Sequence, residues 1–260
     1  MPTTIAVRAD DLTLGYGEGP VAVDGVSFSL EPGAILGVVG EAGSGKSTLA
    51  RAIAAQRLPG EGPMPVIRGG GLEVLGQDVR RLGPKERSRH TLRVGYLPQD
   101  GGSSLEPRLT IGENIASPIF ERDRGFDQRE AGAAVAKLVD AVRLPLGVLD
   151  KFPHELSRGQ RQRIALARAL VLEPRLVIAD DPTMGVDVLV RGHILGVIAE
   201  LQREFGFAAL VIGHDLRELR TITNRIAVMH AGIFVGYGAA DDVLANPLHP
   251  YVARLAELQA

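Results

Sequence analysis

The sequence predicts an α/β protein with a mostly parallel β-sheet flanked by helices. Continuous apolar runs typical of buried strands, at 34–40, 176–179 and 208–212, alternate along the chain with segments whose apolar residues repeat at helical spacing. Strands that alternate with helices form a parallel sheet, because each helix returns the chain to the same edge. At 260 residues and 45% hydrophobic composition, the chain can bury one full core. We therefore expect residues 1–260 to form a single module.

The composition excludes several classes of protein. The net charge is −2, from 29 basic and 31 acidic residues, which argues against a general nucleic-acid binder. The chain has no cysteine, so it has no disulfide, thiolate zinc site or iron–sulfur cluster. The N-terminus lacks the charged start and apolar run of a signal peptide, and no stretch approaches ~18 apolar residues. We expect any membrane role to be peripheral.

The individual elements follow from local patterns. Apolar bursts at 5–7, 12–14 and 26–30, separated by the glycine-rich segment 15–20, predict an N-terminal antiparallel β subdomain. In the helix after Leu156, Ser157 is placed as the N-cap residue. The remaining expected elements are strands at 34–40, 93–99, 176–179 and 208–212, helices at 47–55, 127–144 and 157–174, a loop at 57–71 and a hairpin at 225–236.

The stretch GEAGSGKST at 40–48 predicts a phosphate-binding loop. It fits the pattern G-x-x-x-x-G-K-[ST] and lies between an expected strand and an expected helix, which is the context that the motif requires. Glycines let the backbone curl so that successive N–H groups face phosphate oxygens, and the helix adds the positive end of its dipole. Lys46 is placed to reach the outer phosphates and Ser47 to bind Mg²⁺. The predicted nucleotide-binding residues in the loop are Gly40, Glu41, Ala42, Gly43, Ser44, Gly45, Lys46, Ser47 and Thr48.

Four further stretches indicate which family of nucleotide-binding proteins the sequence resembles. LSRGQRQR (156–163) resembles the signature of ABC ATPases, YLPQD (96–100) their Q-loop, LVIADDP (176–182) their Walker B strand and VIGHDL (211–216) their H-loop. Their order and spacing match that family along nearly the whole chain. Tyr16 lies where these proteins place an aromatic ring that stacks on adenine. The resemblance implies that ATP and Mg²⁺ are the cofactors.

The same resemblance implies an architecture. It is a P-loop NTPase (RecA-like) core at about 1–99 and 157–260, with an inserted helical subdomain at about 100–156. In such proteins the helical subdomain receives the membrane subunits, and ATP lies between the phosphate loop of one module and the signature of another. The signature residues implied to face the partner's ATP are Ser157, Arg158, Gly159 and Gln160. Gln99 would contact Mg²⁺, and Asp187 would end the D-loop along the dimer seam.

Three stretches resemble one subfamily more narrowly. Oligopeptide and dipeptide importer ATPases have segments similar to SSLEPRLTIGENIASPI (103–119), FPHELS (152–157) and NPLHPYVARL (246–255). Nickel importers have similarly short ATPases, so the transported solute stays open. The phosphate loop and the pair Pro107–Arg108 are most like the second ATPase of such systems. This implies a second, usually non-identical ATPase, two membrane permease subunits and an external substrate-binding protein. The implied location is peripheral, on the cytoplasmic face of the cell membrane.

The apolar strand at 176–179 runs into two aspartates, where the family has aspartate followed by glutamate. By resemblance, Asp180 holds the Mg²⁺ shell, Asp181 polarises the attacking water and His214 positions the γ-phosphate. The two carboxylate types differ in basicity by only about 0.5 kcal/mol, but aspartate is one methylene shorter, and a misplacement of ~1 Å can cost roughly a hundredfold in rate. We therefore expect slow hydrolysis at this site, unless a small backbone shift restores the reach.

Three functional hypotheses remain. The first is an ATP-binding subunit of a peptide-class importer that couples ATP hydrolysis to uptake. The second is a structural or regulatory subunit that binds ATP with little turnover, which Asp181 favours. The third is an ABC ATPase acting on DNA or ribosomes, and the sequence lacks the coiled-coil insertions, zinc cysteines or tandem modules that it would need. The basic run at 79–93 is interpreted as a solvated face.

Overall fold

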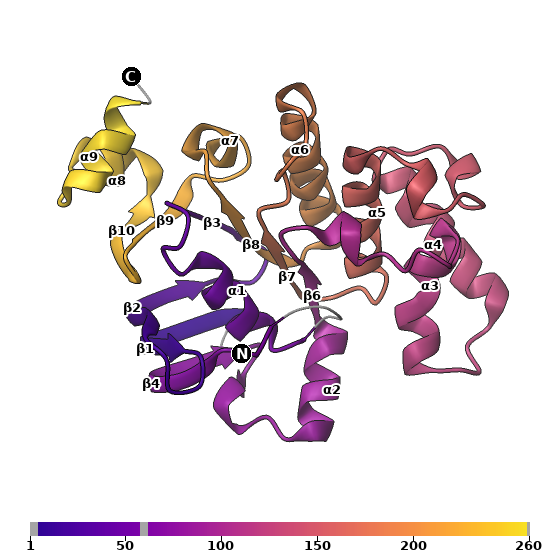
Figure 1. The fold of residues 1–260 in the computed structure, drawn as a ribbon, viewed down its shortest axis with the longest axis horizontal. Helices are drawn as coiled ribbons and strands as arrows, with labels where there is room; N and C mark the ends of the chain where they lie inside the picture. The colour runs from indigo at the N-terminus through magenta and orange to yellow at the C-terminus, as the bar shows by residue number, and fades with distance from the viewer. Residues whose placement is uncertain (1–4, 58–61, 259–260) are drawn as a thin grey trace.

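A parallel sheet forms the centre of the molecule (Figure 1). The computed structural model describes residues 5–57 and 62–258, and in that part of the chain a six-stranded sheet has the order β10-β9-β3-β8-β7-β6. Its strands are β3 (Ile35–Gly40), β6 (Val94–Leu97), β7 (Leu176–Asp180), β8 (Ala208–Gly213), β9 (Arg225–His230) and β10 (Ile233–Ala239). All neighbouring pairs are parallel except β9 and β10, which form the expected antiparallel hairpin. The predicted α/β fold is confirmed.

The N-terminal strands form a second, antiparallel sheet of order β2-β1-β4-β5, as expected. Its strands are β1 (Val7–Gly15), β2 (Val21–Leu30), β4 (Val66–Val74) and β5 (Gln77–Asp78). The apolar burst at 5–7 leads into β1 at Val7, and the burst at 12–14 lies in the same strand, because the chain stays paired through an irregularity at Asp11, whose φ is 50°. The expected loop at 57–71 was wrong for residues 66–71, which lie in β4. Residues 58–61 of that prediction lie outside the described residues.

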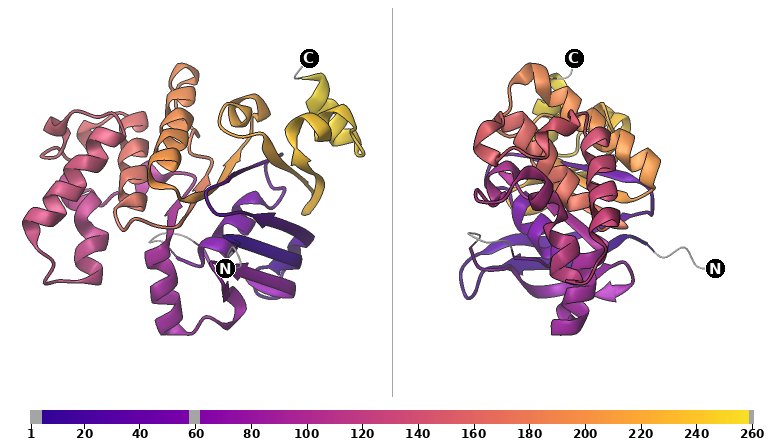
Figure 2. Two further views of the ribbon diagram at one scale, coloured as in Figure 1. Left: turned by 180° about the vertical axis from the view of Figure 1, so that it is seen from behind. Right: turned by 90° about the vertical axis from the view of Figure 1, so that its right-hand side faces the viewer.

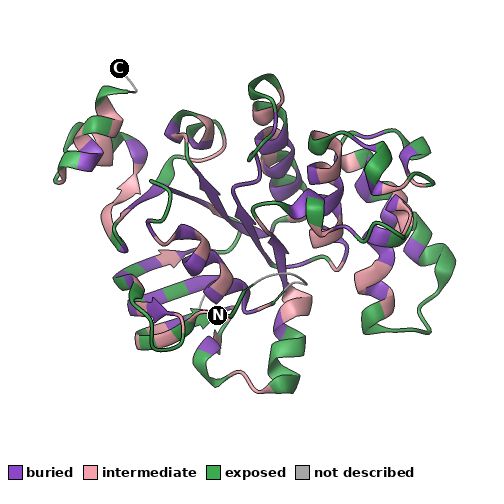
Figure 3. Ribbon diagram, in the orientation of Figure 1, coloured by how far each residue is buried: buried purple, intermediate pink, exposed green. Residues whose placement is uncertain are grey.

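Alternate residues of the central strands enter two different cores. In β7, Val177 and Ala179 contribute to one core, while Leu176 and Ile178 contribute to the other. The helix α1 (Lys46–Ala54) and the antiparallel sheet cover one face, and α5 (Arg158–Leu170), α6 (Val188–Phe205) and α7 (Leu216–Arg220) lie on the other (Figures 1 and 2). The central strands are buried throughout, which explains their uninterrupted apolar sequences (Figure 3).

Two helices, α3 (Ile111–Arg122) and α4 (Gln128–Ala141), lie beside α5 at one end of the molecule (Figure 2). They come from the segment expected to form a helical subdomain. The helix expected at 157–174 begins as predicted but ends at Leu170, since Glu173 adopts a φ of 52° and Pro174 follows it. The other helices are α2 (Pro84–Arg93), α8 (Ala240–Ala245) and α9 (Pro250–Glu257). Among the described residues, no helix is both long and apolar enough to cross a membrane.

The basic run at 79–93 contains α2, which is exposed along most of its length and buries His90. His90 is 1% exposed, and its Nε2 donates a hydrogen bond of 3.0 Å to the carbonyl of Ile53 in α1. The second ring nitrogen, Nδ1, is buried and has no hydrogen-bond partner among the described residues. A second proton would have to be carried by Nδ1, so burial lowers the pKa of His90, and Arg87 and Arg93 lower it further.

We expect His90 to make the protein less stable at acidic pH. The folded state disfavours the protonated imidazole, so the stabilisation is complete above about pH 6.5, the unfolded pKa, and is lost as the pH falls below it. One proton accounts for at most about 1.4 kcal/mol of unfolding free energy per pH unit. Urea unfolding between pH 5 and 8 should show a flatter slope for His90→Gln than for wild type. His193→Gln provides a control, and equal slopes in wild type and His90→Gln would contradict the assignment.

Candidate functional site

The phosphate loop connects the carboxyl end of β3 to the N-terminus of α1. Gly43 and Gly45 have φ values of 79° and 106°, in the region that favours glycine. Gly40 has no room for a side chain, because a Cβ there would overlap the carbonyl of Met229 in the neighbouring strand. These backbone conformations produce the curled loop that the sequence predicted. Its amide groups and the helix N-terminus suit an anion such as a polyphosphate.

Lys46 is buried inside this loop and is only 5% exposed. Its ammonium donates hydrogen bonds to the carbonyls of Gly40 at 2.8 Å and Glu41 at 2.6 Å, and lies 3.3 Å from Oγ of Ser44. Burial lowers the pKa of Lys46, whereas the carboxylates of Asp180 and Asp181 raise it. The structure thus holds a cation at the centre of the loop, with two carboxylates near enough to act on it electrostatically.

Ser47 and Asp180 form a pair of oxygen ligands beside the loop. The Ser47 hydroxyl donates a hydrogen bond of 3.1 Å to Oδ1 of Asp180, which ends β7 and is 2% exposed. A hydroxyl and one carboxylate fit Mg²⁺, which is usually held by one or two carboxylates together with substrate phosphates. The described residues contain no cluster of three or more histidine, cysteine, aspartate or glutamate side chains able to hold a metal alone. The residues present therefore suit a metal that arrives with a nucleotide.

Tyr16 lies in the turn between β1 and β2, and a hydrogen bond connects it to α1. Its hydroxyl donates to Oγ1 of Thr48 at 3.2 Å, and Arg51 donates to the Tyr16 hydroxyl at 3.4 Å. The Arg51 guanidinium also lies 5.9 Å from the centre of the Tyr16 ring. The ring is thus held next to the helix that begins at the phosphate loop, where the sequence placed an adenine contact.

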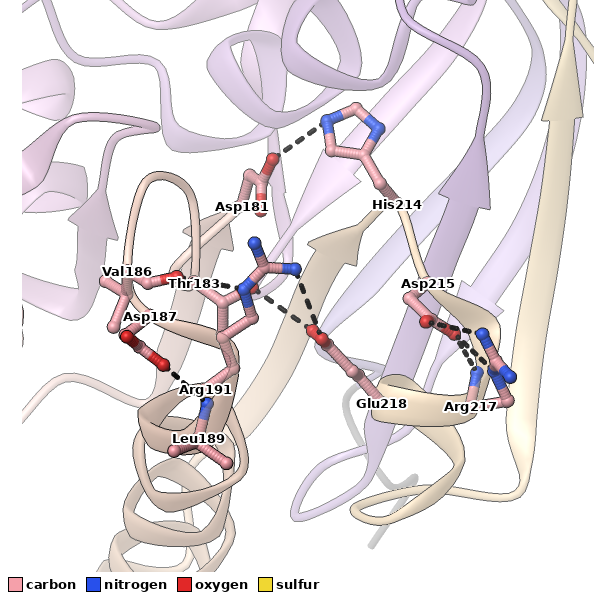
Figure 4. Close-up of polar contacts among 10 residues, drawn as sticks. All are labelled: Asp181, Thr183, Val186, Asp187, Leu189, Arg191, His214, Asp215, Arg217 and Glu218. Atoms are coloured by element: carbon pink, nitrogen blue, oxygen red, sulfur yellow. Dashed lines mark hydrogen bonds and ion pairs between the residues drawn. The ribbon is translucent and has the colours of Figure 1, made fainter.

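Asp181 faces His214, as Figure 4 shows. Oδ2 of Asp181 lies 2.8 Å from Nε2 of His214, which follows the carboxyl end of β8. The Asp181 side chain is 6% exposed, and its backbone φ of 48° is in the left-handed region. Burial raises the pKa of Asp181, while His214, Lys46 and Arg191 act in the opposite direction. A cavity of about 360 Å³ borders both side chains.

The segment after Asp181 is held by two residues that the sequence analysis did not identify. Arg191 donates from Nε to the carbonyl of Val186 at 3.0 Å and lies 3.5 Å from Oε1 of Glu218 (Figure 4). The Thr183 hydroxyl donates to the same Glu218 carboxylate at 3.4 Å. Asp187 caps α6 by accepting the N–H of Leu189 at 2.9 Å. Arg191 and Glu218 come from helices α6 and α7, so no local spacing pattern could have paired them.

The signature residues begin helix α5. Ser157 is the N-cap, as predicted, since its Oγ accepts the N–H of Gln160 at 3.2 Å and the Gln160 side chain accepts the N–H of Ser157 at 2.9 Å. Gly159 lies beside Val186, which belongs to the segment before α6. The short loop that precedes α5 leaves this helix N-terminus partly exposed.

Arg158, the signature residue between Ser157 and Gly159, has specific contacts. Its guanidinium lies 3.6 Å from Oδ1 of Asp100 in the turn after β6. It also covers Gly185, whose φ is 66° and where a Cβ would overlap the guanidinium. Arg158 therefore connects the signature to the segments that follow Gln99 and Asp181.

The structure brings some predicted site residues together and leaves others apart. Lys46, Ser47, Asp180, Asp181 and His214 meet at the carboxyl edge of the parallel sheet. Gln99 follows β6 in an exposed turn, and its side chain makes no hydrogen bond within the described ranges, so its predicted contact with the metal stays a prediction. In the same part of the chain, no hydrogen bond or ion pair joins residues 157–160 to residues 40–48. Within the described ranges, the phosphate loop and the signature are therefore not joined by polar side-chain contacts.

Comparisons with known proteins identify the family of this chain. The family described as ABC transporter matches residues 23–184. The oligopeptide transport ATP-binding protein OppF of Escherichia coli (strain K12) is 40% identical over 90% of this chain and 68% of its own length. OppD of Mycobacterium tuberculosis (strain H37Rv) is also 40% identical over 90% of this chain, which spans only 37% of that longer protein.

A solved structure of the ATP-binding cassette MJ0796, dimeric and bound to ADP and Pi, superposes with a TM-score of 0.78 at 25% identity. The match covers 90% of this chain and 98% of that one. The resemblance to ABC ATPases of oligopeptide importers, which the sequence motifs indicated, is confirmed. Because the ABC transporter family matches residues 23–184, more than half of the sequence, and OppF is 40% identical over 90% of it, this chain belongs to the ABC transporter family.

Proposed function

We propose that this protein is the ATP-binding subunit of an ABC importer of the peptide class, which couples ATP binding and hydrolysis to solute uptake. The observation that carries the proposal is the convergence of Lys46, Ser47, Asp180 and Asp181 at one edge of the sheet. The names of the relatives, oligopeptide transport ATP-binding proteins, supply the transport class. Among the possible transported solutes, the names of these relatives support peptides.

Each residue of the site has a chemical role in this proposal. Lys46 and the loop amides bind the outer phosphates, and the Tyr16 ring stacks on adenine. Ser47 and Asp180 would hold Mg²⁺, which supplies charge neutralisation at the phosphates. Gln99 is proposed to join the metal shell. Asp181 accepts a proton from the attacking water, and His214 orients Asp181 and contacts the γ-phosphate.

The separation of the signature from the phosphate loop supports a partner. Ser157, Arg158, Gly159 and Gln160 begin a helix whose N-terminus is suited to phosphate but is not joined to the chain's own loop. We propose that it meets the ATP held by a second, usually non-identical ABC ATPase, with Asp187 along the seam. Two permease subunits, contacted by the helical subdomain at about 100–156, and an external binding protein complete the system. The subunit would lie on the cytoplasmic face of the membrane.

The short carboxylate of Asp181 supports slow hydrolysis at this chain's own site. Its Oδ2 lies 2.8 Å from Nε2 of His214, a contact that holds the carboxylate in this position. The second candidate function, a regulatory subunit that binds ATP with little turnover, rests on this same residue. Turnover of the Asp181 variants distinguishes the two functions.

Association with the partner ATPase should depend on ATP and on Ser157. Ser157→Asp should keep the N-cap, because aspartate caps helices well, but places a carboxylate against the partner's phosphates. We expect it to abolish the ATP-dependent complex measured by size-exclusion chromatography with light scattering. Ser157→Thr, which keeps both hydroxyl and cap, should still associate. The chain alone should remain mostly monomeric, and a stable homodimer at micromolar concentration would contradict the heteromeric assembly.

Calorimetric titration of the purified chain with ATP tests the nucleotide assignment itself. We expect one ATP per chain and weaker binding when Mg²⁺ is removed with a chelator, because Ser47 and Asp180 would lose the ion that joins them to the phosphates. Absence of binding in the presence of Mg²⁺ would exclude the proposed function. An Asp180→Asn variant should bind ATP in a way that depends less on Mg²⁺.

A further inference from the structure

A second cavity lies at the edge of the sheet opposite the phosphate loop. Arg93, Arg175 and Phe207 directly precede β6, β7 and β8, whereas the ATP-site residues follow the other ends of the parallel strands. The cavity has a volume of about 840 Å³, within the range of small-molecule sites. None of the residues that line it belongs to the phosphate loop, the signature or the H-loop.

Part of the lining of this cavity is apolar. Leu138 of α4, Leu170 of α5 and Phe207 are buried, and Phe205 at the end of α6 packs beside them. These side chains come from both the segment expected as the helical subdomain and the core. A ligand with an apolar chain could therefore contact both parts at once.

Two arginines are among the charged side chains that line the cavity. Lys137 is paired with Glu204 at 3.9 Å and lies 4.8 Å from the centre of the Phe205 ring. Neither Arg93 nor Arg175 has an ion-pair partner among the described residues, although Glu173 also lines the cavity. The backbone N–H of Arg175 donates to the carbonyl of Arg93 at 2.9 Å, which fixes the two residues side by side. Burial lowers the pKa of Arg93, and the charge of Arg175 lowers it further. An anion between them would relieve that repulsion.

We propose that this cavity binds a small amphiphilic anion, with its apolar chain against Leu138 and Phe205 and its carboxylate or phosphate head at Arg93 and Arg175. Guanidinium groups match both anions in geometry, and the apolar side chains of the lining favour an amphiphile over a simple inorganic ion. Because the ligand would contact both α4 and the core, it would favour one orientation of the helical segment over others. The inference does not depend on ATP binding.

The absence of tryptophan from the sequence provides a direct assay. Phe205→Trp introduces a single fluorophore at the cavity wall. Titration with decanoate and with decyl phosphate, below their micelle concentrations, should shift its emission in a saturable way, and decanol should bind at least tenfold more weakly. Calorimetry with the unmodified protein should give the same affinities. The stronger of the two anions identifies the head group.

Charge reversal tests the arginines. In the Phe205→Trp background, Arg175→Glu should weaken decanoate and decyl phosphate binding by at least tenfold without changing ATP affinity. Arg124→Glu, at an exposed arginine that does not line the cavity, should leave the affinities unchanged. Equal binding of decanol and the anions, unchanged affinity in Arg175→Glu, or a response only to phosphatidylglycerol vesicles would each overturn the proposal. Retained far-ultraviolet circular dichroism confirms that each variant is folded.

Discussion

Lys46→Ala should weaken ATP binding by roughly tenfold or more, as expected for the loss of hydrogen bonds to a charged group. The ammonium lies within the loop, 2.6 to 2.8 Å from two of its carbonyls, so it is the side-chain charge best placed for the outer phosphates. Calorimetry with ATP and Mg²⁺ measures the effect. ADP, which lacks the γ-phosphate, should lose less affinity than ATP.

The matched control is Lys85→Ala, which removes an exposed ammonium from the first turn of α2. It should bind ATP as the wild type does. Because the Lys46 variant leaves the carbonyls of Gly40 and Glu41 without this donor, thermal unfolding should be measured for both variants. Unchanged ATP affinity in a folded Lys46→Ala protein would remove the phosphate-loop assignment.

Asp181→Glu should raise hydrolysis at this chain's own site. The added methylene extends the carboxylate beyond its present position beside His214 and towards the attacking water. If about 1 Å of reach is missing, the gain can approach a hundredfold in turnover. ATP affinity should remain nearly unchanged, because the main contacts of the nucleotide lie in the phosphate loop.

Asp181→Asn shows whether Asp181 already acts as an effective general base. If little general-base catalysis operates, this variant should lower turnover only modestly. A loss of ~10²-fold or more would show that the aspartate already acts as the base. Both variants must be measured in the assembled pair with the partner's site disabled. If glutamate does not help and asparagine abolishes activity, the account of the two aspartates is wrong.

The parts of the site that could be predicted from sequence are those built by local chain geometry. The phosphate loop needs glycine at positions such as Gly43 and Gly45, where φ is positive, and its helix starts at once. Ser157 and Gln160 form a capping box within one helical turn, so the start of α5 was also predictable. Buried strands such as β7 and β8 were recognisable because both their faces are covered.

What the sequence did not reveal depends on contacts between distant segments. β4 contains Gly69–Gly71, which suggested a loop, and it is a strand because it pairs with β1 from Val7 to Gly15. Arg191 and Glu218 meet across two helices. Arg158 has a role only because Asp100 and Gly185 lie beside it. Such pairings follow from the tertiary fold, which local periodicity does not encode.

The most direct test of the account is phosphate release by the purified chain, alone and after addition of the partner ATPase in which the catalytic carboxylate that corresponds to Asp181 has been replaced, so that the partner still binds ATP. If a second module completes the ATP site, the chain alone should be nearly inactive. Turnover should then appear when the disabled partner is added, and should require Mg²⁺ and Lys46 of this chain. Equal rates with and without the partner would contradict the composite site.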